Sequence, residues 1–249
     1  MTYYSSDLES EHKKEAIKKR LRYRKAYNYV GDSVLGGIDG CVTTFAVVAG
    51  AFGAHFPGYV IIIMGFANLI ADGFSMAVSN YLRAKSERDQ VQESRETEEF
   101  HIDYIPEGER EEIRQIYRNK GLTGEILENV VQAITKDRQL WINTMLTEEY
   151  GLQLEGPNPI KAGVVTFVSF ITVGLVPLIP FLFYQTSTNQ FIVSVLITIV
   201  AFFLVGIARG VVLGRQPIRS GIISVVSGSG AASLAFIVGV LLRRYSTGP

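Results

Sequence analysis

Long apolar runs alternate with strongly polar segments along this chain. Five of the runs are long enough for a helix to cross a bilayer, at roughly 33–55, 57–82, 162–184, 191–213 and 218–242. An odd number of spans places the two termini on opposite sides of the membrane. The pattern predicts an all-α membrane protein with five transmembrane helices in each protomer.

A polar segment separates the second run from the third. Its helix signals predict a first helix that continues out of the membrane from 83 to about 100, a second at 106–119 and a third at 137–151. A shorter helical piece is predicted near 125–134. Asp137 is a good N-cap for the third helix. The protein is therefore expected to carry a three-helix insert between its second and third spans.

Charge is segregated along the chain, although 24 basic and 24 acidic residues give a net charge of +0. Eight basic residues fall between Lys13 and Lys25, and the stretch from Glu87 to Glu155 holds 17 acidic residues against 8 basic ones. Basic residues mark cytosolic loops. Here the basic residues mark one face of the membrane as cytosolic. They are those of the arm before the first span, together with Arg83, Lys85, Arg209, Arg215 and Arg219. The N-terminus and the insert are thus predicted to be cytosolic, although Arg243 and Arg244 go against the rule.

Other compositional features narrow the class of protein. The first 25 residues are polar and charged, without the apolar core of a cleavable signal peptide. The single cysteine, Cys41, excludes an internal disulfide. Nucleic-acid binding is not expected, because the basic arm lies beside a membrane span and more plausibly sets orientation or touches anionic lipid.

Two carboxylates lie inside apolar spans, where an uncompensated charge is expensive and usually functional. Asp39 is in the first span, and Asp72 is in the second, one helical turn before Met76. Carboxylate oxygen and thioether sulfur together suit a divalent transition metal. The alternative for Met76 is a filler residue of the span.

Residues around Asp39 add further candidates. The glycines beside it (Gly36, Gly37 and Gly40) allow a neighbouring backbone to approach closely, or the helix to loosen as in transporters with interrupted helices. Cys41 is a small packing residue with a ligand role left open. Asp32, at the cytosolic entrance, attracts cations or caps the helix.

Three pairs in the insert have helical spacing, and each pair projects from one side of its own helix. The pairs are Glu98 with His101, Glu109 with Glu112, and Met145 with Glu149. If the three sides converge, their oxygen, imidazole and thioether groups would surround divalent ions. The alternatives are a solvated face for the glutamates and a core position for Met145, one turn from Trp141.

Small residues recur every fourth position in the last two spans. They are Gly206, Gly210 and Gly214 in the fourth span and Ser224, Gly228 and Ala232 in the fifth. Such faces let helices pack closely in lipid. The packing can lie between protomers or within one.

Four stretches stand in order between about Asn28 and Arg244: GGIDGCVTTFAVVAGA, IADGFSMAVSNYLRAKSE, LWINTMLTEEYGL and GLVPLIPF. In sequence, order and spacing they resemble the vacuolar iron transporter family. The resemblance implies a five-span protomer that dimerises, a metal path at the dimer interface and a cytosolic helical domain that holds further metal ions. It also implies movement of ferrous iron, and often manganese, out of the cytosol in exchange for protons.

The resemblance also carries over single residues. Asp39 and Met76 match the pathway aspartate and methionine of the family, and its cytosolic ligand positions correspond here to Glu98, Glu109, Glu112, Met145 and Glu149. Three positions depart from the family pattern. His101 stands where a ligand glutamate is expected, and Leu146 replaces a second methionine. Asn68 stands where plant members carry a pathway glutamate, so either Asp72 substitutes for it or the pathway chemistry differs.

The predicted organisation has a basic arm at 1–30, two transmembrane helices at 31–84, an acidic metal-binding domain at 85–157 and three transmembrane helices at 158–245. The predicted transport pathway comprises Asp39, Met76, Asp72, Asp32 and Asn68. The predicted metal ligands of the insert are Glu98, His101, Glu109, Glu112, Met145 and Glu149.

The predicted function is not enzymatic. We expect a homodimeric, proton-coupled transporter, without a prosthetic group, that exports Fe²⁺ and Mn²⁺ from the cytosol, with Co²⁺ and Zn²⁺ as further candidate ions. The membrane would be vacuolar in a eukaryote and the plasma membrane in a prokaryote. A membrane-anchored metal sensor or buffer is the main alternative. An intramembrane aspartyl protease is another, although the chain lacks the Gly-x-Gly-Asp context of that group.

Overall fold

The computed structural model describes residues 10, 12–22, 27–183 and 187–247. These residues form helices and no strands. Five helices or helix groups are long and apolar enough to cross a membrane, as the sequence predicted. They are α3 (Val30–Gly53), the first part of α4 (Gly58–Tyr104), the 159–183 group, α10 (Ser187–Val212) and α11 (Pro217–Thr247).

The third span is not the single helix that was expected. It is divided into α8 (Pro159–Gly174), the short 3₁₀ helix η1 (Val176–Leu178) and α9 (Ile179–Phe183). Pro177 and Pro180 lack the backbone N–H that a continuous helix needs at these positions, and their rings clash with the preceding turn. The predicted span at 162–184 is confirmed, and it is divided near its far end.

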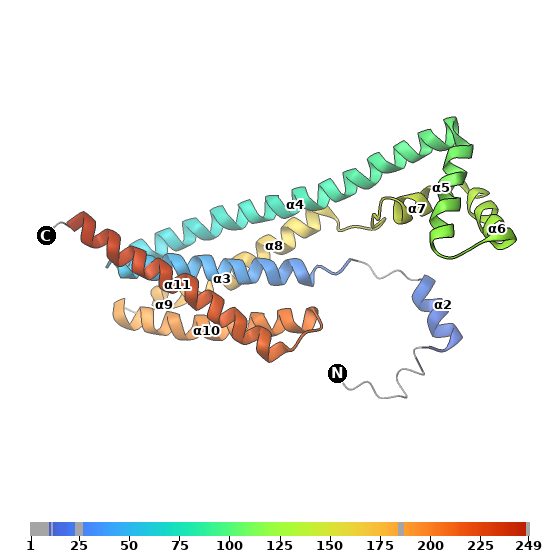
Figure 1. The fold of residues 1–249 in the computed structure, drawn as a ribbon. Coiled ribbons are helices and arrows are strands. Elements are labelled where there is room, and N and C mark those ends of the chain that lie inside the picture. The colour runs from blue at the N-terminus through green and yellow to red at the C-terminus, as the bar shows by residue number, and fades with distance from the viewer. Residues whose placement is uncertain (1–9, 11, 23–26, 184–186, 248–249) are drawn as a thin grey trace.

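The spans form a bundle in which α3 is central, since it packs against α4, α8, α10 and α11. Figure 1 shows these helices side by side, with the C-terminal end of α11 at the end of the bundle away from α5, α6 and α7. Two apolar clusters fill the bundle; one includes Val48, Leu69 and Phe170, and the other includes Phe45 and Phe202. Of the predicted basic arm, residues 1–9, 11 and 23–26 lie outside the described residues, and the described part includes the helix α2 (Lys14–Arg22).

The glycines near Asp39 explain how closely α3 and α8 approach. A Cβ atom added to Gly40 would lie 2.3 Å from the carbonyl oxygen of Phe170, and one added to Gly36 would lie 2.5 Å from that of Thr166. The helix α3 is continuous through Asp39. Of the two predictions made for these glycines, close backbone approach is confirmed, and a loosened or interrupted helix is wrong because the space serves packing.

The small residues of the last two spans pack α10 against α11 within one protomer. A Cβ atom on Gly206 would lie 2.7 Å from the Cα of Gly221, and one on Gly228 would lie 2.3 Å from the ring of Phe202. Gly214 has a different role, because its φ of +63° belongs to the turn after α10. This face is therefore used inside the bundle.

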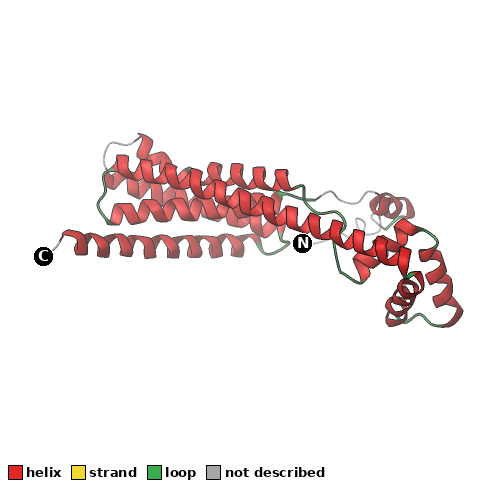
Figure 2. Cartoon of the chain, turned by 90° about the horizontal axis from the view of Figure 1, so that it is seen from above, coloured by secondary structure: helices red, strands yellow, loops and turns green. Residues whose placement is uncertain are grey.

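The helix α4 is 47 residues long and runs without a break from the bundle into the polar segment. At 1.5 Å per residue it measures about 70 Å, roughly twice the thickness of the hydrocarbon core of a bilayer. Three helices pack around its far end: α5 (Pro106–Asn119), α6 (Gly124–Thr135) and α7 (Arg138–Glu148). Figure 2 shows this group at one end of the elongated molecule. We refer to residues 85–157 as the insert.

The insert has its own apolar core. The fully buried residues Ile113, Met145 and Leu146 meet Trp141 there. Helix signals read from the sequence set its boundaries: Pro106 begins α5, Gly121 follows it with a φ of +93°, and the Asp137 side chain accepts hydrogen bonds from the N–H groups of Gln139 and Leu140. The cytosolic placement of the insert remains a prediction.

Candidate metal sites

Two glutamates are buried inside the insert. Glu98 on α4 and Glu109 on α5 are each 1% exposed. One carboxylate oxygen of each glutamate and one imidazole nitrogen of His101 lie within 4.8 Å of one another. The Nδ1 atom of His101 is 3.3 Å from Oε1 of Glu109 and 3.9 Å from Oε1 of Glu98. A solvated face, the alternative reading of these glutamates, is therefore wrong for Glu98 and Glu109.

The local sequence explains why these side chains meet. Glu98 and His101 are three residues apart on α4, so they lie on one side of that helix. A turn at Ile105 lets α5 fold back, which brings Glu109 over the same side. The packing of Ile102 and Ile113 in the shared core fixes this arrangement.

Repulsion between carboxylates is built into the cluster. Burial raises the pKa of Glu109 to about 8, and the charges of Glu98 and Glu112 add to the increase. Burial, together with Glu112 and Glu98, also raises the pKa of Glu149. A divalent cation would relieve this repulsion, and carboxylate and imidazole groups are suitable ligands for Fe²⁺ and Mn²⁺.

Exposed acidic residues of the insert are arranged differently. Arg114 pairs with Glu111 and Glu128, and Arg138 pairs with Asp103 at 2.5 Å. For Glu98 and Glu109, in contrast, the ion-pair partner found in the described part of the chain is His101. In the described part of the chain, arginines therefore pair with several surface acids, whereas the buried pair has the imidazole of His101 beside it.

The other predicted ligands of the insert differ in burial. Glu112 and Glu149 are exposed, and their negative charges contribute to the raised pKa of Glu109. Met145 is fully buried in the apolar core with Trp141. Its packing role is thus observed, and its role as a ligand stays a prediction.

One functional candidate of the insert was missed from the sequence. The hydroxyl of Tyr150, just after α7, donates a hydrogen bond of 3.0 Å to Oε1 of Glu98. Burial and this hydrogen bond raise the pKa of Tyr150, which keeps the hydroxyl protonated. The sequence signal that could have indicated Tyr150 was its position directly after the predicted ligand Glu149.

The membrane-spanning part holds a second group of polar residues. Asp72 is exposed on α4, Asp39 is half-buried on α3, and the charge of Asp72 acts on Asp39. Asn68 and Met76 lie one turn to either side of Asp72. Met76 packs partly against the apolar cluster of Leu69 and Phe170, and the Nδ2 atom of Asn68 is buried without a hydrogen-bond partner among the described residues. Cys41 is buried in apolar packing, as the first of its two readings predicted.

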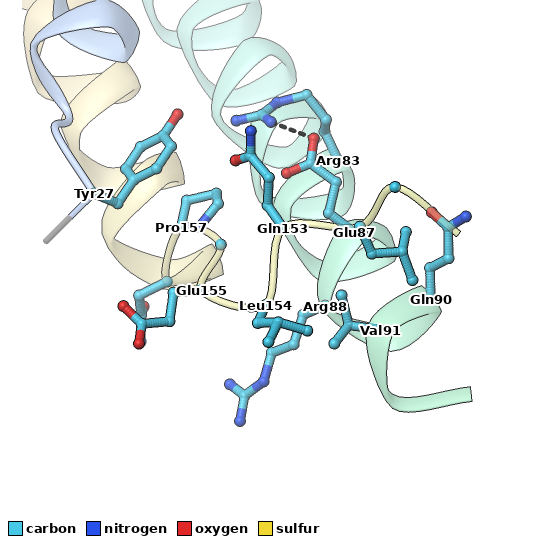
Figure 3. A pocket seen from close by; sticks show the side chains of 14 residues that line it. Tyr27, Arg83, Glu87, Arg88, Gln90, Val91, Gln153, Leu154, Glu155 and Pro157 are labelled. Atoms are coloured by element: carbon cyan, nitrogen blue, oxygen red, sulfur yellow. Dashed lines mark hydrogen bonds and ion pairs between the residues drawn. The ribbon is translucent and has the colours of Figure 1, made fainter. Parts of the chain in front are cut away.

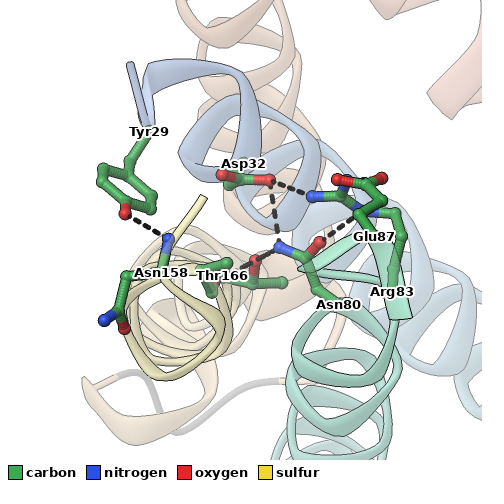
Figure 4. A network of polar contacts seen from close by, with 8 residues as sticks. Tyr29, Asp32, Asn80, Arg83, Glu87, Asn158 and Thr166 are labelled. Atoms are coloured by element: carbon green, nitrogen blue, oxygen red, sulfur yellow. Dashed lines mark hydrogen bonds and ion pairs between the residues drawn. The ribbon is translucent and has the colours of Figure 1, made fainter. Parts of the chain in front are cut away.

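Asp32 belongs to a polar network where α3, α4 and α8 meet (Figure 4). The Nδ2 atom of Asn80 donates to Oδ1 of Asp32 at 3.0 Å and to the hydroxyl of Thr166 at 2.7 Å. Arg83 donates to Oδ1 of Asn80 at 2.9 Å and lies 3.6 Å from Asp32. Asp32 lies in the first turn of α3, where a negative charge is favourable to the helix dipole, so both roles predicted for it stay open.

A cavity of about 650 Å³ lies on the stretch of α4 between the two candidate sites, beside the linker at 151–158 (Figure 3). Arg83 and Glu87, which pair at 2.6 Å, line it together with Tyr27 and Arg88. None of the predicted site residues lines it. The cavity is therefore separate from the candidate metal ligands.

Comparison with known proteins identifies the family. The model of the VIT family matches residues 30–240. The chain belongs to the VIT family. It is 32% identical over 226 residues to the vacuolar iron transporter of Toxoplasma gondii, covering 87% of this chain and 75% of that protein.

Plant relatives match over a similar length. Identity to vacuolar iron transporter 1 of Oryza sativa subsp. japonica is 32%, covering 83% of this chain and 82% of that protein. Identity to vacuolar iron transporter 1 of Arabidopsis thaliana is 31%, covering 86% of each. The predicted family resemblance is confirmed. Since this VIT family chain is related to transporters rather than enzymes, the prediction that it is not an enzyme is confirmed as well.

Proposed function

We propose that this protein is a proton-coupled exporter of divalent transition metal, Fe²⁺ and also Mn²⁺, from the cytosol into a vacuole or out of the cell. The observation that carries the proposal is the pair of carboxylates, Asp39 and Asp72, in helices apolar enough to span a bilayer. A charge in that position is retained for a function such as cation passage. The named relatives are iron transporters, which supports Fe²⁺ as the substrate.

Proton coupling follows from the same carboxylates. A metal ion that leaves Asp39 and Asp72 uncovers two negative charges in a region of low dielectric constant, where bare charges are strongly disfavoured. Protons can neutralise them on the far side and then compete with the next metal ion. A proton gradient would in this way draw metal out of the cytosol.

The insert acts as a cytosolic collecting site in this proposal. Glu98 is 26 residues beyond Asp72 on the same continuous helix, so the two sites are about 40 Å apart along α4. One ion cannot occupy both. The exposed and buried acids of the insert would raise the local cation concentration before transfer.

The protein is proposed to work as a homodimer. Asp72 is exposed on α4 beside Ile70 and Phe74, and a carboxylate facing lipid tails would be costly. A second copy packed on this face of α4 would cover Asp72 and complete an enclosed path. Asp39, half-buried on α3, would line the same path.

Cross-linking tests the dimer. Cys41 is buried, so Phe74→Cys introduces an accessible thiol on the proposed interface, and Leu204→Cys introduces a matched one on the exposed surface of α10. A thiol-reactive linker should join two copies of the Phe74→Cys protein in the membrane and leave Leu204→Cys monomeric on a denaturing gel. Equal cross-linking of both variants would contradict this interface.

Transport itself is tested in sealed proteoliposomes. Fe²⁺ and Mn²⁺ influx, with Co²⁺ and Zn²⁺ alongside, should appear only with protein present, and an imposed pH gradient should accelerate it. Metal bound to the protein without any flux would favour the alternative of a membrane-anchored sensor or buffer. Flux that is indifferent to the pH gradient would remove proton coupling from the proposal.

A further inference from the structure

Each buried carboxylate of the insert has one oxygen engaged and one without a partner. Oε1 of Glu98 accepts the hydrogen bond from Tyr150 at 3.0 Å, and Oε1 of Glu109 lies 3.3 Å from Nδ1 of His101. The Oε2 atoms of both glutamates are buried and have no hydrogen-bond partner among the described residues. A buried oxygen without a hydrogen-bond partner is unfavourable, so these two atoms are the ones that a cation would stabilise.

Tyr150 comes from a different element than the carboxylate it contacts. It follows α7, whereas Glu98 is on α4, 52 residues earlier in the chain. The backbone N–H of Tyr150 donates to the carbonyl of Met145, which holds the residue against the end of α7. The ring is 40% exposed, and its hydroxyl reaches inward to the buried carboxylate. The packing of α7 on α4 thus positions the Tyr150 hydroxyl for this hydrogen bond.

We propose that Tyr150 is a positioning residue that reserves Oε1 of Glu98, so that Glu98 binds a divalent cation through Oε2 alone. The inference rests on the insert being a metal site, as proposed above. Partners of this kind orient a ligand, and their loss typically lowers metal affinity about 10–100-fold. Tyr150 touches the ligand and not the metal.

Single-oxygen binding also affects which ion is preferred. Ca²⁺ is large and commonly takes both oxygens of a carboxylate in sites of six to eight ligands, whereas smaller ions favour octahedral sites of single oxygens. With one oxygen of Glu98 committed to Tyr150, the insert would discriminate against Ca²⁺. Tyr150 therefore contributes to selectivity for Fe²⁺ and Mn²⁺, in addition to affinity.

The test uses the full-length protein in detergent and compares wild type with Tyr150→Phe. Tyr104→Phe, a substitution of a 72% exposed tyrosine at the end of α4, is the matched control. Titrations with Mn²⁺ and with Ca²⁺, followed by calorimetry and by the Mn²⁺ electron paramagnetic resonance signal, give both affinities. Tyr150→Phe should weaken Mn²⁺ binding by about 10-fold or more and Ca²⁺ binding much less. The control should match wild type for both ions.

Four results would overturn the inference. Equal losses for the two ions would mean a general structural role, and unchanged affinities would mean none. A visible charge-transfer band with Fe³⁺ that disappears in Tyr150→Phe would make the phenol a direct ligand. A wild-type protein that binds neither ion would also remove the proposed insert site, whereas normal wild-type binding with an unaffected Tyr150→Phe variant would remove only the role of Tyr150.

Discussion

The insert and the membrane-spanning bundle hold their carboxylates in opposite ways. In the insert, Glu98 and Glu109 are almost completely buried, and helices of one chain bring them together. In the bundle, Asp72 lies on the exposed surface of α4, and Asp39 is only half-buried. The two carboxylates of the insert are enclosed within one protomer, while those of the bundle have an open side.

This difference limits how each pair of carboxylates can bind metal. A site closed by its own chain can bind metal in an isolated protomer, with an affinity set by local packing. A site that is open toward the lipid is useful only when something covers it, and the proposed second copy would do so. Collection and translocation are then separate properties, and each can be lost without the other.

The largest expected effect separates the two sites by removing one of them. Asp39→Asn should abolish metal flux in proteoliposomes, because the amide removes a charge that both metal and proton need, and should leave metal binding by the insert unchanged. Asp89→Asn, an exposed change on the insert part of α4, is the matched control. Flux within about twofold of wild type in Asp39→Asn would contradict the assigned role.

The second prediction removes the other site. At a free Mn²⁺ concentration of about 100 times the dissociation constant, one binding site should add about 2.7 kcal/mol to the free energy of unfolding. Glu98→Gln with Glu109→Gln should remove most of that gain, and Glu112→Ala with Glu149→Ala should reduce it. Chemical denaturation with and without metal measures the gain.

The metal-free state provides the control for this prediction. Without metal, the Glu98→Gln and Glu109→Gln protein should be no less stable than wild type, because the two carboxylates repel each other. A large loss of stability in the metal-free state would instead mean that the pair is needed for folding.

The third prediction concerns pH. Glu109 titrates near 4.5 in an unfolded chain and at about 8 in the folded protein, so the folded metal-free state keeps a proton that the unfolded state has lost. Its contribution to stability should therefore be full below pH about 4.5 and should be lost as pH rises to about 8. Metal binding must expel this proton, so affinity should increase over the same interval.

Calorimetry in two buffers of different ionisation enthalpy measures the proton release. Release should approach one proton per metal ion toward the acidic end of the interval and should vanish in Glu109→Gln. A metal affinity that does not change between pH about 5 and about 8 would contradict the prediction.

The smallest expected effect is on selectivity in the membrane. Met76→Leu keeps the volume and removes the sulfur, so it should reduce Fe²⁺ flux several-fold relative to Mn²⁺, the harder of the two ions. Competition between the two metals in one liposome preparation measures the ratio. Equal reductions would mean that Met76 only packs against Leu69 and Phe170.

Much of the fold follows from local signals in the sequence. The apolar runs predicted five spans, and Pro106, Gly121 and the Asp137 cap predicted the boundaries of α5 and the start of α7. The break in the third span was missed, although Pro177 and Pro180 carried the signal. The length of that apolar run favoured a single helix, while the prolines removed the hydrogen bonds that it needed.

The candidate sites were predictable only as far as helical spacing reaches. Spacing places Glu98 beside His101 and Glu109 beside Glu112, but it does not tell which glutamate is buried. That outcome depends on the turn at Ile105 and on packing between helices distant in the chain. The contact of Tyr150 with Glu98 has the same origin, and so does the network that joins Asp32 to Asn80 and Arg83.

The unbroken helix α4 has a consequence for the evolution and engineering of this protein. The angle between Asp72 and Glu98 about the helix axis is fixed, because α4 is one continuous helix between them. Each residue inserted into or deleted from the stretch at 84–97 would rotate the insert by about 100° about the helix axis relative to the bundle. Changes of seven residues, close to two full turns, preserve the relative direction far better than changes of one or two. Length in this stretch should therefore vary among related chains in steps that keep this angle, whereas the linker at 151–158 is free of that constraint.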